Sequence, residues 1–216
     1  MENQQLENCE QQVLENGDLD AFGQLILHYQ KRLERVITFR MDGRLRSRMD
    51  ATDVLQETFV EATRRIPDFQ ACQGKMTFFL WLRFLAVQKL NQLHRHHLGV
   101  QARDAAREVG IYQYAHGQMT SVVLAAQLLG KMTSPSRAAI REENRVRLEQ
   151  SLSELDDIDR EILALRHFEQ LSNSETARLL ELSESASSNR YFRAVRRLKA
   201  VMNRINKSNS GIFHDS

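Results

Sequence analysis

The chain has few of the residues that break helices. Its 216 residues include two prolines and nine glycines. A protein built from strands needs many turns and usually more of both residues, so their scarcity favours helices. Hydrophobic residues make up 42% of the chain, which is enough for packed cores and excludes wholesale disorder.

Cysteine and long apolar runs are also scarce. The two cysteines, Cys9 and Cys72, are far apart and fit no metal or redox spacing, so a reducing cytoplasm is the simplest location. The first residues are polar where a signal peptide has an apolar core. No apolar run is long enough to cross a bilayer. We therefore expect a cytoplasmic protein without membrane insertion.

The motifs of common enzyme classes are missing. The sequence contains no P-loop, no dinucleotide-binding glycine motif, no H-E-x-x-H and no G-x-S-x-G. His94, His96 and His97 lack the i, i+4 spacing that places two metal ligands on one helical face, and no cysteine completes a site. We therefore expect no catalysis, no metal and no cofactor.

Residues 1–98 have the periodicity of a compact helical domain. Apolar residues recur every three or four positions over 10–40, which predicts a helical hairpin. Asp50 is a candidate N-cap for the next helix, and Asp53 lies in the first turn, where the helix dipole favours an anion. Pro67 is expected to end that helix.

A polar loop over 68–77 is expected before a third helix, Phe78–His97. Trp81, the sole tryptophan, is expected to pack in the core rather than stack on a base. Amides and cations beside aromatic residues also suit unpaired bases. The polar positions of this helix are Arg83, Gln88, Lys89, Asn91, Gln92 and Arg95.

The C-terminal region predicts a helix-turn-helix. A helix from Asp156 to Phe168, with Ile158 in its buried face, is expected first. Ser172 and Glu175 then fit the S-x-x-E capping box that opens a short helix, and Ser183 is a candidate N-cap for a longer one. A short helix, a tight turn and a longer helix form a helix-turn-helix. The stripe expected to face the core of the longer helix is Tyr191, Val195, Leu198, Met202 and Ile205.

Charge is distributed unevenly over this region. No acidic residue occurs from Ser185 to His214, whereas 140–184 hold twelve acidic residues against six arginines. A helix with many cations and no anions repels itself unless an anion neutralises it, and the phosphate backbone of DNA is the natural partner. The cations are Arg190, Arg193, Arg196, Arg197, Lys199, Arg204 and Lys207.

The start of a recognition helix enters the major groove of DNA. Short polar side chains and asparagine can read base edges there, and arginine can pair with guanine or hold a phosphate. The candidate DNA-contacting residues are therefore Glu184, Ser185, Ser188, Asn189, Arg190, Arg193 and Arg197.

Two segments resemble the extracytoplasmic-function (ECF) group of bacterial sigma factors. DATDVLQETFVEATRRIPDF (50–69) and FFLWLRFLAVQKLNQLHRHH (78–97) are similar to sigma domain two, and 155–202 are similar to domain four. The order of the two matches, with a linker between them, is what makes the resemblance specific. It implies an all-α fold of two small helical domains: domain two at 1–98, a partly helical linker at 99–145, domain four at 146–206 and a disordered tail at 207–216.

The resemblance also implies partners and roles. The chain would bind core RNA polymerase, both its β′ clamp helices and its β subunit, and direct it to promoter DNA. The third helix and the loop before it would capture and melt the minus-ten element, and the helix from 184 would read the minus-thirty-five element. An anti-sigma factor is a further candidate partner. The residues that would contact polymerase are Asp53, Gln56, Glu57 and Val60.

The chain departs from the family at three places. Gln88 replaces a frequent asparagine and Gln92 lies near a frequent aspartate, which bears on minus-ten preference. Glu181 takes the place of a glycine in the turn before the recognition helix. A positive φ there would cost about 1 kcal/mol. Ser187 replaces a larger apolar residue and would bury less.

Two other functions remain open on the sequence. A stand-alone DNA-binding regulator would dimerise on a palindromic site without polymerase, but would leave 50–97 without a role. An all-helical adaptor would dock its basic helix on an acidic protein and bind DNA poorly at physiological salt. A hydrolase is the weakest option, because its motifs are absent.

Overall fold

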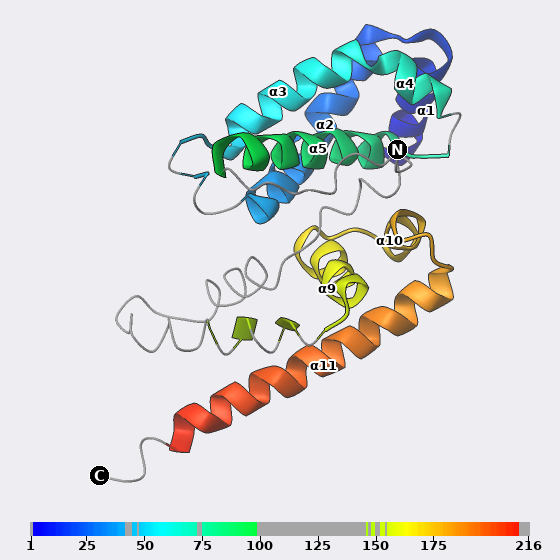
Figure 1. Cartoon of the computed structure of the whole chain (residues 1–216). Helices are drawn as coiled ribbons and strands as arrows, with labels where there is room; N and C mark the ends of the chain where they lie inside the picture. Colours follow the sequence, from blue (N-terminus) through cyan, green and yellow to red (C-terminus); the bar gives the residue numbers. More distant parts are fainter. Residues whose placement is uncertain are drawn as a thin grey trace. The chain divides into compact units, whose positions relative to one another are not determined.

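The computed structural model of the chain consists of helices joined by turns and loops, and no strand occurs in the described residues. It divides into two compact units, with the boundary between Gly117 and Gln118, and each unit is described by itself (Figure 1). The expected linker, 99–145, lies outside the described residues. The structure describes residues 2–41, 45–46, 48–72, 75–98, 146, 148–149, 152–153 and 155–211.

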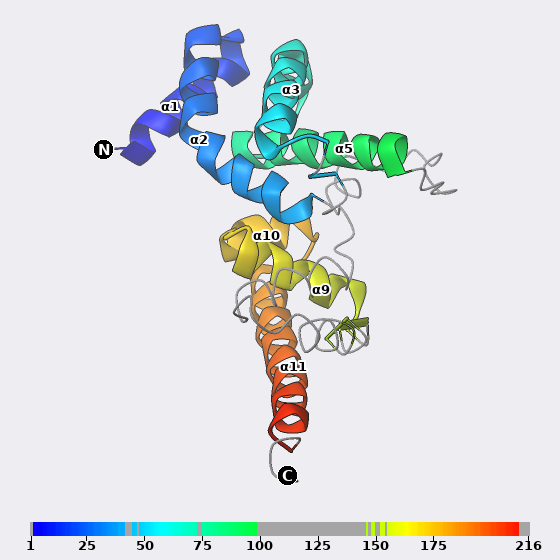
Figure 2. The same cartoon turned by 90° about the vertical axis from the view of Figure 1, so that its left-hand side faces the viewer.

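The N-terminal unit is a bundle in which α2, α3 and α5 pack against one another. The helix α1 packs on α2, and the short α4 contacts α1 and α3 (Figures 1 and 2). No helix in the described part of the chain is long and apolar enough to span a membrane. The helices of this unit are α1 (Glu2–Asn16), α2 (Leu19–Arg40), α3 (Ala51–Arg64), α4 (Ile66–Ala71) and α5 (Phe78–Leu98).

The turn between α1 and α2 forms the predicted hairpin. Gly17 has φ +63°, a left-handed conformation that glycine adopts without steric cost. Asp18 follows as the N-cap of α2, and its carboxylate accepts the backbone N–H groups of Asp20 and Ala21 at 2.9 and 3.0 Å. The reversal is therefore set locally, and it lets α1 pack along α2.

The predicted start of α3 is confirmed, but its end differs from expectation. Asp50 and Asp53 form a reciprocal capping box, each carboxylate accepting the other residue's backbone N–H. The helix α3 ends at Arg64, and Pro67 lies in the first turn of α4. Proline fits that position because the first N–H groups of a helix need no intrahelical acceptor. Pro67 thus starts a helix inside the segment expected as a loop.

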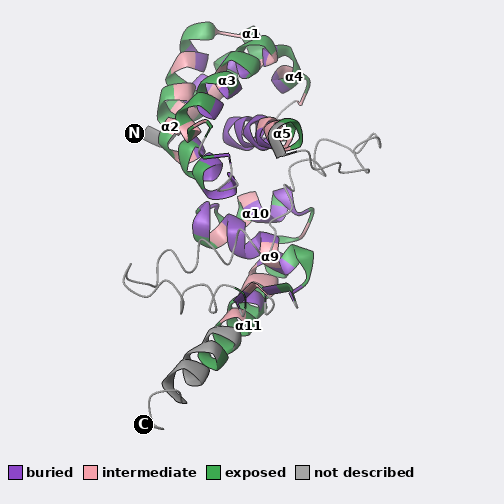
Figure 3. Ribbon diagram, turned by 60° about the vertical axis from the view of Figure 1, so that its left-hand side comes forward, coloured by how far each residue is buried: buried purple, intermediate pink, exposed green. Residues whose placement is uncertain are grey.

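The centre of the N-terminal core is α5, which is buried continuously from Phe78 to Val87 (Figure 3). Trp81 is buried as predicted, with its ring centroid 5.1 Å from that of Phe69 and 5.6 Å from that of Phe78. The placement of Arg83 was wrong: its side chain is fully buried. Because α5 is enclosed on every side along its first half, this stretch has no solvent-exposed face for Arg83 to occupy.

Glu10 is a partly buried acid on α1, beside the hydroxyl of Tyr29. Burial raises the pKa of its carboxyl group above the usual value, so stability falls as pH rises from the ordinary pKa through the raised one. Glu10→Gln removes the ionisation. We expect the variant to be more stable than wild type at pH 7 and equal to it below the ordinary carboxyl pKa, as measured by urea unfolding across pH.

The C-terminal unit packs α9 and α10 against the first half of a long helix, α11. Leu148, Leu152 and Leu155, which precede α9, are buried, as are Ile162 and Leu163 of α9. The last turn of the helix expected over 156–168 is π-helical and forms η1. The elements are α9 (Asp157–Leu163), η1 (Ala164–Phe168), α10 (Asn173–Leu179) and α11 (Glu184–Gly211).

Three expectations for this unit were wrong. Ile158 is 41% exposed and Val195 is 36% exposed. Tyr191 and Leu198 of the predicted stripe are half-buried, and the side chains of Met202 and Ile205 lie outside the described part. The small residues Ser187 and Ala194 are fully buried instead, which lets α11 approach its neighbours closely. The tail expected to be disordered from 207 is helical as far as Gly211, because no proline or earlier glycine interrupts α11. Residues 212–216 lie outside the described part.

Candidate nucleic-acid interface

The helices α10 and α11 form the predicted helix-turn-helix. Ser172 and Glu175 make both hydrogen bonds of the capping box: the Ser172 N–H donates to the carboxylate at 2.7 Å, and the Glu175 N–H donates to the hydroxyl at 3.1 Å. The Ser183 hydroxyl accepts the backbone N–H of Ala186 and so caps α11. The Asn173 side chain donates to the carbonyl of Glu184 at 2.9 Å. That bond ties the start of α10 to the start of α11.

The turn between them has the strained geometry that the sequence suggested. Glu181 has φ +54°, and the N–H groups of Glu181 and Leu182 donate to the carbonyls of Arg178 and Ala177. These two bonds are those of a Schellman motif, whose left-handed position is usually glycine. A side chain there costs roughly 1–2 kcal/mol, so the turn is held against local strain.

Glu181→Gly should therefore stabilise the C-terminal unit. Relief of the strain, less the greater freedom of glycine in the unfolded chain, leaves a gain of about 0.5–1 kcal/mol. Urea unfolding followed by circular dichroism measures it. Ser185→Gly, in regular helix one turn away, is the control and is expected to lose stability. A loss in both variants would show that Glu181 is not strained.

The first half of α11 has two distinct sides. Ser187 and Ala194 face the interior, and in the described residues the buried Ser187 hydroxyl oxygen has no hydrogen-bond partner. Phe192, by contrast, is 65% exposed. The solvent side is hollowed into a depression of about 430 Å³, lined by Asn189, Phe192, Arg193 and Arg196.

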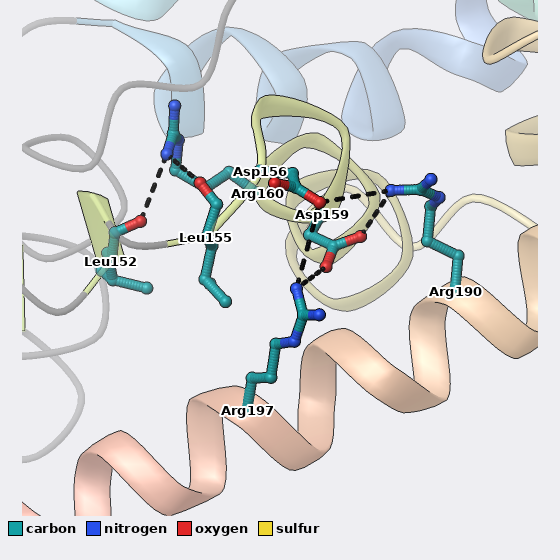
Figure 4. A network of polar contacts seen from close by, with 7 residues as sticks. All are labelled: Leu152, Leu155, Asp156, Asp159, Arg160, Arg190 and Arg197. Carbon is teal, nitrogen blue, oxygen red and sulfur yellow. Dashed lines mark hydrogen bonds and ion pairs between the residues drawn. The ribbon is translucent and has the colours of Figure 1, made fainter.

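A buried carboxylate on α9 holds two arginines of α11 (Figure 4). Asp159 is 4% exposed; its Oδ1 accepts from Arg190 Nη1 at 2.9 Å, and its Oδ2 accepts from Arg197 Nη1 at 2.9 Å. Asp156 lies 4.0 Å from both guanidinium groups. On the other side of this network, Arg160 donates to the carbonyls of Leu152 and Leu155.

The seven residues predicted to contact the minus-thirty-five element thus divide into two sets. Arg190 and Arg197 are bonded to Asp159 on α9, although both side chains keep part of their surface exposed. Residues three, four or seven apart share one side of a helix. Arg190 and Arg197 therefore lie on the same side of α11 as the buried Ala194. The other five residues are exposed or half-buried: Glu184, Ser185, Ser188, Asn189 and Arg193.

In the N-terminal unit, α3 and α5 form a groove of about 810 Å³. The groove brings together most of the residues predicted to bind polymerase, on α3, and most of those predicted to bind the minus-ten element, on α5. The two sets are about thirty positions apart in the sequence. Carboxylates and cations lie side by side in it: Glu57 pairs with Lys89, and Glu61 is 4.0 Å from Arg65. Its lining includes Gln56, Glu57, Val60, Glu61, Arg64, Arg65, Leu85, Gln88, Lys89, Gln92 and Arg95.

The predicted polymerase-binding residues all lie on α3, but they differ in what they can offer a partner. The Asp53 carboxylate is already engaged in the capping box. Glu57 pairs with Lys89 across the groove, with 2.6 Å between Oε2 and Nζ. Gln56 is exposed, and Val60 is an apolar side chain that is 53% exposed.

The predicted minus-ten residues lie on α5 and mostly line the groove. Lys89, Gln92 and Arg95 do so, whereas Asn91 lies outside the lining and Arg83 is buried. Gln88 accepts a hydrogen bond from Arg65 Nη1 at 3.0 Å through its Oε1. Arginine can only donate, so this bond fixes the orientation of the amide and leaves its N–H groups for another acceptor.

Sequence reasoning missed several residues of these two sites. Arg65 is held by Asp68 at 2.7 Å and orients Gln88, but nothing in the local pattern indicated that contact. Asp159 was one of many acids before the helix-turn-helix. Phe192 and Arg196 could have been found, because they share a helical face with Asn189 at intervals of three and seven.

No cluster of three His, Cys, Asp or Glu side chains that could hold a metal occurs in the described residues. Both surfaces present amide groups, guanidinium groups and exposed apolar side chains.

The chain is similar to several known proteins. The sigma-70 region 4 family matches residues 145–198. The RNA polymerase sigma-H factor of Pseudomonas aeruginosa is 29% identical over 195 residues, which cover 86% of this chain and 89% of the relative. The ECF RNA polymerase sigma-E factor of Haemophilus influenzae is 25% identical, covering 84% and 87%. A solved structure of CnrH in complex with the cytosolic domain of CnrY is 24% identical with a TM-score of 0.48, covering 90% and 95%.

Proposed function

The chain belongs to the extracytoplasmic-function group of bacterial RNA polymerase sigma factors, and on this premise we propose how its two units divide the work. As a sigma factor it acts in transcription initiation. The N-terminal unit binds core RNA polymerase and the minus-ten element, and the C-terminal unit reads the minus-thirty-five element. Both tasks use binding energy alone, in the cytoplasm.

The observation that carries the proposal is the solvent side of α11 in a helix-turn-helix, which has no acidic residue after Glu184. Asn189 and Arg193 face outward at the end of the helix that would enter the major groove. Phe192 and Arg196 extend the same surface. Arginine and asparagine read purine edges, and an aromatic ring suits the methyl group of thymine. The hollow they line is therefore the minus-thirty-five contact surface.

The α5 side of the groove suits unpaired bases. Gln88, with its Oε1 taken by Arg65, offers N–H donors to a base acceptor. Gln92 and Arg95 of the same helix are exposed. Arg64 and Arg65 add positive charge to the groove, which favours a phosphate backbone. We assign the α5 side of the groove to the minus-ten strand.

The α3 side of the groove is assigned to polymerase. Gln56, Glu57 and Val60 combine an amide, a carboxylate and an exposed apolar side chain on α3. Interfaces of this kind gather their binding energy in a few apolar side chains that the partner buries, with polar groups at the rim. Asp53 contributes to this surface by capping α3. The β′ clamp helices and the β subunit are the expected partners, and an anti-sigma factor stays a prediction.

In vitro transcription with core polymerase tests the proposal. The double variant Arg193→Ala/Arg196→Ala should lower initiation at promoters that depend on the minus-thirty-five element by tenfold or more, because each lost contact costs roughly 1–3 kcal/mol. Binding to core polymerase should not change. Lys31→Ala, an exposed cation on α2, is the control. Wild-type protein that binds a palindromic duplex without polymerase, and fails to direct transcription, would contradict the proposal.

A further inference from the structure

The recognition helix α11 carries more positive charge than it presents to DNA. Arg190 and Arg197 are bonded to one buried carboxylate, each at 2.9 Å. Their side chains are nevertheless 29% and 53% exposed. Both guanidinium groups therefore reach solvent at their edges, while their charge is neutralised by Asp159 and the nearby Asp156. Asp159 therefore affects the charge that α11 offers to DNA as well as the packing of the helix.

Each cation that neutralises a phosphate releases a counterion, and this term strengthens binding to any duplex whatever its sequence. Specific contacts to base edges add to it but do not depend on it. A helix with all its cations free would gain affinity for non-specific DNA and lose discrimination. The bonds of Arg190 and Arg197 to Asp159 reduce this sequence-independent affinity. They leave the base-reading surface of Asn189 and Arg193 unchanged.

We infer that Asp159 is a specificity-determining residue, which keeps Arg190 and Arg197 away from DNA phosphates and so limits non-specific binding. The inference rests on the proposed function, since it assumes that α11 holds duplex DNA. Asp159 contacts no DNA itself. It acts through the two arginines, as a positioning residue that also fixes α11 against α9.

The salt dependence of DNA binding separates this role from a structural one. The full-length protein is titrated with a short duplex that lacks promoter elements, at several salt concentrations. In Asp159→Asn, the plot of log affinity against log salt should steepen by about 0.9 for each arginine released, to at most about 1.8 for both. Affinity at low salt should rise, and the preference of the holoenzyme for promoter over non-specific DNA should fall. Damage to the fold would lower affinity and flatten the slope instead.

Asp157→Asn is the matched control, because it makes the same change in net charge on the same helix. Asp157 is 73% exposed and pairs with Arg160 within α9, so its loss releases no cation of α11. The slope should then stay close to that of wild type. Equal steepening in both variants would attribute the effect to net charge and overturn the inference.

A second comparison leaves Asp159 in place and does not risk the fold. Arg197→Gln keeps Arg190 as a partner for the buried acid, and it should leave the slope unchanged. Arg193→Gln, on the exposed side, should make it shallower by about 0.9. Equal flattening by both substitutions would show that Arg197 already contacts phosphate and would overturn the inference. If wild-type protein shows no salt-dependent duplex binding, the inference and the assignment of α11 to DNA both fail; a wild-type response without the difference between variants defeats the inference alone.

Discussion

Val60→Asp is expected to weaken binding to core polymerase by about 30-fold or more. The side chain is apolar, 53% exposed and on the α3 side of the groove, where a partner would bury it. A carboxylate at that position would lose its water in the complex, and burial of an unpaired charge costs roughly 2 kcal/mol or more. That loss corresponds to about 30-fold in affinity. Titration of labelled core polymerase with the purified variant measures the change.

Leu27→Asp is the control for this substitution. Leu27 is 72% exposed on α2, so the same chemical change is made on an apolar residue outside the groove. We expect wild-type affinity from it and an unchanged far-ultraviolet spectrum from both variants. If the two variants lose affinity equally, or if neither does, Val60 is not part of the polymerase interface.

Trp81→Ala should destabilise the N-terminal unit by about 3–5 kcal/mol, the usual cost of truncating a buried aromatic residue. The ring is 2% exposed and packs against Phe69 and Phe78, and the neighbours cannot close the space because α5 is enclosed. Since Trp81 is the sole tryptophan, the variant must be followed by circular dichroism during urea unfolding. The transition of the C-terminal unit should not move.

Phe192→Ala provides the comparison. It also removes an aromatic ring, but from a side chain that is 65% exposed, and such changes usually stay within about 0.5 kcal/mol. Similar losses in the two variants would mean that Trp81 does not anchor its core. In wild-type protein, tryptophan fluorescence should report the unfolding of the N-terminal unit alone.

Local signals in the sequence predicted local structure well. The capping box of Ser172 and Glu175 and the left-handed turn at Glu181 were both confirmed, because each depends on residues a few positions apart. The hairpin of α1 and α2 was confirmed for the same reason. Burial of Trp81 followed from its size and hydrophobicity, which favour the interior wherever a core exists.

Contacts between elements could not be predicted in the same way. Arg83 and Arg95 look alike in the sequence, yet the first is buried and the second is exposed, because α5 enters the core at one end and leaves it at the other. The direction of Arg190 depends on Asp159, thirty-one residues earlier. Periodicity predicts which side of a helix faces inward, but it does not predict which charged residue of a neighbouring helix lies against that side. The assignments of individual residues to polymerase and to DNA remain predictions.

The groove between α3 and α5 has a consequence for genetics. Under the proposed assignments, variants that lose polymerase binding and variants that lose minus-ten binding would alter side chains of the same groove. Some of these side chains are bonded across it, as Glu57 is to Lys89. A screen scored only by reporter output would place both in a single phenotypic class. A suppressor substitution on one helix could compensate for a defect on the other, and it would not show whether binding of polymerase or of the minus-ten strand had been lost. Equilibrium assays with each ligand separately are needed to tell the two classes apart.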